Sequence, residues 1–118
     1  MVEKERFTLK PIDINKLIAS QVLGYEVKDD NIVKEGRCRT GIPSYSQKIE
    51  HAWQVVEKMR KDYDFWFELT TPESFSLKTK CYFQLDDIEV SAVCETASMA
   101  ICKAALLAIE AKNKNLTK

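Results

Sequence analysis

The side chains that could perform acid–base or nucleophilic chemistry are few and scattered in this sequence. His51 is the only histidine, and it falls on the polar side of an expected helix, where a surface histidine is the simpler interpretation. A general base needs a positioned partner and a cleft. Asp86 and Asp87 resemble a carboxylate pair, but their place between two strand patterns predicts a hairpin turn first. Phosphate loops, nucleophile elbows and metal-binding helix motifs do not occur in the sequence, which therefore predicts a protein that is not an enzyme.

The four cysteines also lack the spacing of a metal site. Cys38, Cys81, Cys94 and Cys102 form no Cys-x-x-Cys pair, and zinc sites need closely spaced ligand pairs. The last three fall in step with apolar neighbours, which predicts small core residues in a reducing compartment. Cys38 lies between two arginines, whose charge would favour its thiolate, although an incidental loop cysteine is the simpler interpretation. We expect neither a metal nor a cofactor.

Two groups of side chains are better suited to binding. The first is a basic loop with Arg37 and Arg39, which leads to Ser46 at the expected start of a helix. Helix N-termini attract anions, and nearby arginines strengthen that attraction. A solvated loop without a ligand is the alternative.

The second group lies on one face of an expected sheet. Aromatic planes and positive charges alternate there, a combination that can stack a base and hold a phosphate. The alternative is that the N-terminal helix covers the two aromatic rings. The predicted ligand-binding residues of both groups are Arg37, Arg39, Ser46, Trp66, Lys78, Lys80 and Tyr82.

Composition limits the class of protein. The 118 residues suit one domain, with residues 1–10 as a flexible leader, 11–112 as the domain and 113–118 as a frayed tail. The 18 basic and 18 acidic residues cancel, which argues against a partner that is a long nucleic acid. The sequence has neither a run of about 18 apolar residues nor a signal peptide, so we expect a cytoplasmic protein without membrane contact.

The elements that must position these residues start with two helices. Pro11 opens an expected helix over residues 12–23, which ends at Gly24, and residues 25–43 read as a loop with one short strand at 31–34. A second helix is expected within residues 43–59, where Ser44 and Ser46 suit an N-cap and Ser44 with Gln47 matches a capping box. Its apolar stripe is predicted at Ile49, Ala52, Trp53, Val56 and Met59, with Trp53 central.

Three strands and a last helix complete the predicted fold. Residues 64–70, 77–85 and 88–94 alternate with period two, and short connections between them predict an antiparallel meander. The last helix, over residues 96–111 and capped by Thr96, is apolar around most of its circumference and must be covered on two sides. The sheet can cover one side, and a second helix or another subunit must cover the other. We expect a homo-oligomer, with a dimer as the commonest closure. The fold class is α+β, a three-stranded antiparallel meander packed with three helices in the order α-loop-α-β-β-β-α.

Two segments resemble a known family. PSYSQKIEHAWQVVEKM (residues 43–59) resembles a pattern of the phage ABA-sandwich domain family, and MAICKAALLA (residues 99–108) resembles its alanine-rich closing helix. The resemblance implies a small protein of a bacteriophage or prophage, located in the bacterial host, with helices arranged around a sheet. The family defines no activity, so it supplies no catalytic residues. The basic segment 25–41 departs from its pattern.

Two functions from different classes fit these expectations. In the first, an oligomeric, non-catalytic phage protein sequesters a small anionic nucleotide-like molecule, such as an immune signal of the host, in an anti-defence role. In the second, the protein is an interaction or inhibitor module that docks through its apolar last helix and binds no small ligand.

Overall fold

The computed structural model describes residues 10–34, 38–71 and 77–116. It confirms the α+β fold class and contains two antiparallel sheets of three strands each. The elements, in chain order, are α2 (Pro11–Leu17), η1 (Ile18–Val22), β1 (Glu26–Lys28), β2 (Asn31–Lys34), β3 (Cys38–Gly41), α3 (Ile49–Lys61), β4 (Trp66–Thr70), β5 (Thr79–Leu85), β6 (Ile88–Cys94) and α4 (Ala97–Leu116).

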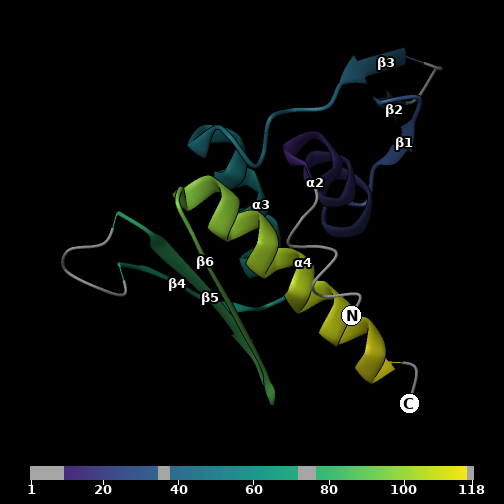
Figure 1. The fold of residues 1–118 in the computed structure, drawn as a ribbon. Coiled ribbons are helices and arrows are strands. Elements are labelled where there is room, and N and C mark those ends of the chain that lie inside the picture. The colour runs from purple at the N-terminus through teal and green to yellow at the C-terminus, as the bar shows by residue number, and fades with distance from the viewer. Residues whose placement is uncertain (1–9, 35–37, 72–76, 117–118) are drawn as a thin grey trace.

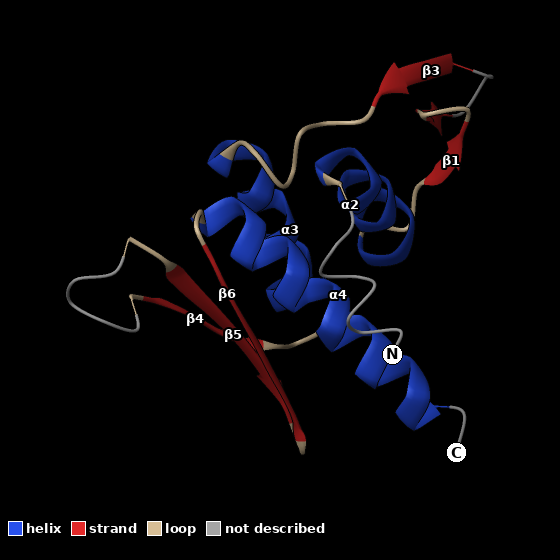
Figure 2. Cartoon of the chain, in the orientation of Figure 1, coloured by secondary structure: helices blue, strands red, loops and turns tan. Residues whose placement is uncertain are grey.

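These elements form layers (Figure 1). The β4–β5–β6 sheet lies on one side, α3 and α4 pack on its inner face, and α2 with η1 packs on the far side of α4. The β1–β2–β3 sheet stands beyond α2, at the opposite end of the molecule from β4–β6 (Figure 2). In the described residues, no helix is long and apolar enough to cross a membrane.

The predicted meander is confirmed. Strands β4, β5 and β6 pair in chain order, and Leu85 pairs with Ile88 across the two-residue turn at Asp86 and Asp87. Asp86 adopts a φ of 54°, a left-handed conformation that aspartate tolerates in turns. The hairpin interpretation of this carboxylate pair was therefore the right one.

The first helix follows its predicted boundaries but changes its winding. Pro11 occupies the first turn, and from Ile18 to Val22 the chain winds as a π-helix, in which the Leu23 N–H bonds the Ile18 carbonyl at 3.0 Å. Gly24, with a φ of 76°, then ends the element, as expected.

The loop predicted over residues 25–43 is wrong, because the described part of this segment contains the three strands β1, β2 and β3, which form one sheet. Only β2 matches the short strand predicted at 31–34. Asp29 and Asp30 both adopt positive φ, 52° and 66°, and make the tight turn between β1 and β2. The strands have three or four residues and bury little beyond Ile32, so no apolar period develops along them.

The predicted start and phase of the second helix are also wrong. Helix α3 begins at Ile49, and Ser44 instead closes a separate turn through its carbonyl, which accepts hydrogen bonds from the N–H groups of Gln47 and Lys48. The predicted capping box therefore does not form. The buried side chains of α3 are Ala52, Val55, Val56 and Met59. Trp53 and Ile49 lie about half exposed at the edge of this face, so the apolar stripe is rotated from the predicted one.

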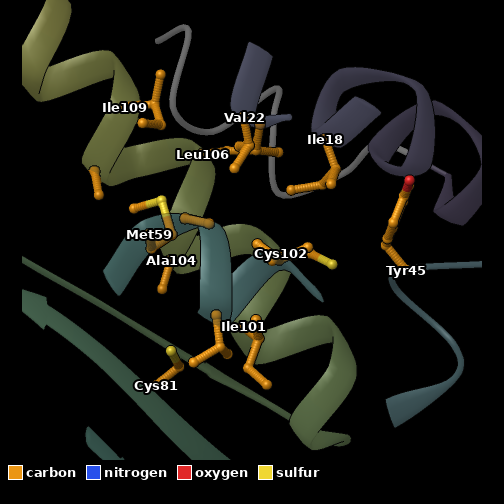
Figure 3. Close-up of a cluster of buried hydrophobic side chains, with 14 of the residues drawn as sticks. Ile18, Val22, Tyr45, Met59, Cys81, Ile101, Cys102, Ala104, Leu106 and Ile109 are labelled. Carbon is orange, nitrogen blue, oxygen red and sulfur yellow. The ribbon is translucent and has the colours of Figure 1, made fainter. Parts of the chain in front are cut away.

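Helix α4 is the centre of the core. Eight of its apolar side chains are at most 5% exposed: Ala100, Ile101, Cys102, Ala104, Ala105, Leu106, Ala108 and Ile109. Figure 3 shows Ile18 and Val22 of η1 near Leu106, and Met59 of α3 near Ala104. Cys81 of β5 lies near Ile101 on the sheet side. Thr96 caps the helix, as predicted, by accepting a hydrogen bond from the Met99 N–H at 3.2 Å.

Other elements of the same chain cover the apolar surface of α4. The sheet covers one side of α4, and α3 and η1 cover others, all within one chain. The apolar surface of α4 therefore gives no reason to expect a second subunit, and it is not available for docking. Helix α4 also continues to Leu116, past residue 112, where the sequence predicts the domain to end.

Candidate functional site

The outer face of the β4–β5–β6 sheet is the surface best suited to bind a partner. Strand register arranges its side chains in three rows, which are Trp66–Gln84–Glu89, Glu68–Tyr82–Ser91 and Thr70–Lys80–Val93. The opposite face, with Phe67, Cys81 and Phe83, packs into the core. No described helix lies over the outer face (Figure 1), so the alternative in which the N-terminal helix covers Trp66 and Tyr82 is wrong.

Hydrogen bonds hold the two aromatic side chains of this face. The Trp66 indole donates its Nε1–H to Glu68 Oε2 at 2.9 Å, and the Tyr82 hydroxyl donates to Glu89 Oε1 at 2.8 Å. The hydrogen bond to Glu89 raises the pKa of Tyr82. Trp66 is nevertheless 61% exposed, a large apolar area to leave in water. The face therefore presents aromatic rings in restricted orientations.

Glu68 and Glu89 are the residues that sequence reasoning missed. The signal was present, because Glu68 has the same strand parity as Trp66, and Glu89 pairs with Gln84 in the register. Two carboxylates beside the aromatic rings repel an anion, while their remaining acceptor positions suit cationic or N–H groups. Lys80 is half-buried in the third row and is the only cation among the nine side chains of the three rows.

Lys78 lies at the end of the sheet rather than among the three rows. It precedes β5 and lines a groove of about 400 Å³ with Cys94, Met99 and Lys103, where β6 leads into α4. Burial raises the pKa of the Cys94 thiol, and the charges of Lys103 and Lys78 oppose that rise. This thiol is therefore held in its protonated form despite its cationic neighbours.

The structure does not bring the predicted arginine group to this face. Arg39 lies exposed on β3, where its Nη1 is 3.6 Å from Asp29 Oδ2, and β3 stands at the opposite end of the molecule from β5 (Figure 1). Arg37 lies outside the described residues. Arg39 therefore lies away from Lys78 and Lys80, so the structure does not bring it together with the second predicted group.

Ser46 has a structural role in place of the predicted ligand contact. It is 2% exposed, and its backbone N–H and its hydroxyl both lie within hydrogen-bond distance of Asn15 Oδ1, at 2.9 and 2.8 Å. These contacts tie the segment before α3 to α2, because Asn15 is also buried. The hydroxyl expected to face an anion thus lies inside the protein.

The remaining chemical groups form no reactive cluster in the part of the chain that the structure describes. His51 is half-buried rather than on the surface, and the edge of its ring faces Tyr45 at a centroid distance of 6.5 Å. Its Nδ1 has no hydrogen-bond partner among those residues. The described residues also contain no group of three or more His, Cys, Asp or Glu side chains that could hold a metal ion. Burial raises the pKa of Cys81 to about 12 and raises that of Cys102 as well, and both thiols belong to the core.

Known proteins are similar to this chain in sequence and fold. Residues 16–106 match the family model of the phage ABA sandwich domain. Among solved structures, a phage protein from Bacillus cereus ATCC 14579 shares 48% sequence identity and a TM-score of 0.76, covering 86% of this chain and 93% of its own. No curated protein matches the chain. The two segments that resemble the family in sequence lie in α3 with its preceding turn and in α4, the two helices that pack on the inner face of the sheet. The chain belongs to the phage ABA sandwich domain family.

Proposed function

We propose that this phage-family protein is a non-catalytic binding protein that recognises a protein partner with the outer face of its β4–β5–β6 sheet. The observation that carries the proposal is the pair Trp66 and Tyr82, both held by carboxylates on a sheet face that no described element covers. Tryptophan and tyrosine are enriched at the energetic centres of protein interfaces. A ring whose orientation is already restricted loses less conformational entropy on binding.

Charge on this face indicates the kind of partner. Glu68 and Glu89 each use one oxygen for an aromatic side chain of the same protein, which leaves acceptor capacity for the partner. A partner surface with lysine or arginine side chains would complement these two carboxylates. This proposal keeps the interaction-module hypothesis but moves its surface from α4, which is buried, to the sheet.

A small nucleotide-like anion is the second candidate ligand. Lys80 lies next to Tyr82 along β5 with one residue between them, so a base over the aromatic rings could place its phosphate toward Lys80. The carboxylates of Glu68 and Glu89 weaken this candidate, and so does the distance of Arg39 from the sheet. An anti-defence role by sequestration rests on this second candidate.

The test compares partner retention by matched variants. The unmodified protein and the variants Trp66→Ala and Ile12→Ala are used as bait for an extract of phage-infected host cells. Ile12 is 55% exposed on α2, away from the sheet, so its variant removes a comparable exposed apolar side chain. We expect a partner that is retained by the unmodified protein and Ile12→Ala and lost by Trp66→Ala. Equal retention by all three proteins would contradict the proposal.

Calorimetry separates the two ligand classes. A panel of mononucleotides and cyclic dinucleotides is titrated into the unmodified protein. The protein-partner proposal expects no heat of binding. Heat that disappears in Lys80→Ala would instead support the nucleotide-like ligand.

A further inference from the structure

Among the residues that the structure describes, no strand pairs with the outer edge of β4. In the order β4–β5–β6, β4 pairs with β5 on one side and with no described strand on the other. Natural edge strands are usually blunted by lysine, proline, a bulge or an inward-pointing charge, because unpaired N–H and C=O groups otherwise recruit another strand. The sequence of β4, Trp-Phe-Glu-Leu-Thr, contains no lysine or proline, and its one charge points outward.

Exposed aromatic surface adjoins this edge. Trp53 of α3 is 46% exposed, and its ring contacts Phe67 of β4 edge-on, with centroids 5.8 Å apart. At the start of β4, a groove of about 590 Å³ is lined by Arg60, Lys61, Asp64, Phe65, Trp66 and Phe67. An unpaired backbone edge and half-exposed rings therefore lie side by side, a combination that a pairing strand with its own apolar side chains would bury.

We propose that β4 pairs with β4 of a second copy of this chain, antiparallel and about a twofold axis at Phe67. The two three-stranded sheets then become one six-stranded sheet. A second copy fits because each of the two chains would contribute the same backbone edge and the same Trp53–Phe67 contact, as an interface with twofold symmetry requires.

Strand parity, charge and the Trp53–Phe67 contact together select the register. Side chains alternate between the two faces of a strand. Phe67 and Leu69 therefore stay on the inner face in both chains only when odd-numbered residues of one β4 lie opposite odd-numbered residues of the other. If Glu68 lay opposite Glu68 of the second chain, two carboxylates would be directly opposite each other, which is unfavourable. If Trp66 lay opposite Trp66 of the second chain, Glu68 would lie opposite Asp64, which again opposes two carboxylates. With Phe67 opposite Phe67, Glu68 of each copy is opposite Trp66 of the other, and the carboxylates are separated.

This register preserves a contact already present in one chain. The Trp66 indole donates to Glu68 within β4, and in the dimer each carboxylate also has the partner's indole opposite it. The outer face would become continuous over six strands, with two Trp66–Glu68 pairs near its centre. The dimer does not depend on the proposed partner, although it would double the surface proposed to bind it.

Sedimentation of the full chain tests the dimer. At micromolar concentration we expect a species of twice the 13.6 kDa of one chain. Trp53→Lys, which adds charge beside the edge, should raise the dimer dissociation constant at least about tenfold, while Ile12→Lys on α2 should leave it unchanged. Far-ultraviolet circular dichroism checks that both variants are folded. A single 13.6 kDa species for the unmodified protein would overturn the proposal.

Disulfide trapping tests the register without relying on Trp53. Trp66→Cys and Glu68→Cys are made separately in a Cys38→Ser background, which removes the exposed native thiol. Because positions 66 and 68 are opposite in the proposed dimer, mixing the two proteins under mild oxidation should yield mainly the mixed disulfide. If either variant alone crosslinks as well as the mixture does, the twofold axis is not at Phe67. A monomer that still retains its partner on the outer face would overturn the dimer and leave the proposed function standing.

Discussion

The hydroxyl of Tyr63 donates a hydrogen bond to the backbone carbonyl of Val22 at 2.8 Å. Val22 is the last residue of the π-helix η1, and Tyr63 follows α3, so the bond joins the N-terminal element to the central helical layer. Lys112 of α4 lies over the same ring, with its Nζ 4.5 Å from the centroid. The last carbonyls of a helix have no partner within the helix, and here the side chain of Tyr63, which follows α3, satisfies one of them.

Tyr63→Phe removes that hydrogen bond and keeps the ring. We expect a loss of about 0.5–1.5 kcal/mol in the free energy of unfolding, the usual contribution of one intramolecular hydrogen bond. Urea denaturation followed by circular dichroism measures it. Tyr25→Phe, which removes the hydroxyl of a half-exposed tyrosine, is the matched control and should change stability by no more than about 0.5 kcal/mol. Equal effects of the two variants would show that the Val22 bond contributes nothing.

Asn15 and Ser46 provide the second prediction. Asn15→Leu leaves the buried N–H of Ser46 without its acceptor, while the Ser46 hydroxyl keeps the Pro11 carbonyl at 3.3 Å, and a buried unsatisfied group costs about 1–3 kcal/mol. Ser46→Ala removes only one donor and should cost less, about 1 kcal/mol. The order of the two urea midpoints checks the assignment. Ser46→Ala as damaging as Asn15→Leu would contradict it.

Trp53→Ala should reduce stability less than expected for a residue at the centre of the apolar stripe that the sequence predicts. Because nearly half of the side chain is already exposed, we expect a loss of about 1–2 kcal/mol in the isolated chain, below the ~3–5 kcal/mol typical of a buried aromatic. Phe83→Ala, at a position with no exposure, should reach that larger range. Chemical denaturation of both variants at a concentration too low for dimers measures the difference. If the Trp53 variant were as unstable as the Phe83 variant, Trp53 would be a core residue, as the apolar stripe predicted from the sequence implies.

The sequence predicts the β4–β5–β6 sheet better than it predicts the β1–β2–β3 sheet. The period-two alternation of residues 64–94 predicts β4, β5 and β6, because each strand is long enough to show which side is buried. Strands β1 and β3 have three and four residues and are mostly exposed, so they leave no such pattern. In α3, Ile49 and Trp53 are apolar at helical spacing and indicate one stripe, whereas the packing against α4 buries the adjacent one.

The site was predictable in part for similar reasons. Strand parity places Trp66 on one face of β4, and it places Lys80 and Tyr82 together on one face of β5. Only the strand register shows that these two faces form the same side of the sheet. The contact of Ser46 with Asn15 joins residues 31 positions apart and depends on how α2 packs, which local pattern does not reveal. The separation of Arg39 from Lys80 likewise follows from the placement of a sheet that the sequence pattern did not indicate.

Alkaline pH should weaken the fold through buried acids. Burial raises the pKa of Tyr45 to about 12 from its ordinary value of 10.0. The native state therefore holds this proton in a range where the unfolded chain has released it, and stability falls as pH rises from 10 toward 12. Tyr45→Phe should make the denaturation midpoint less dependent on pH in this window than in the unmodified protein. An unchanged slope would show that Tyr45 ionises freely in the native state.

The central claim, that the outer face of β4–β6 is the recognition surface, is tested most directly by hydroxyl-radical footprinting of the protein alone and in complex with the partner that it captures. Oxidation of Trp66 and Tyr82 should fall on binding, since a partner on this face would cover both rings. Oxidation of Tyr25, about half exposed before β1, should stay the same. Unchanged labelling of Trp66 and Tyr82 in the complex, with protection elsewhere, would contradict the account.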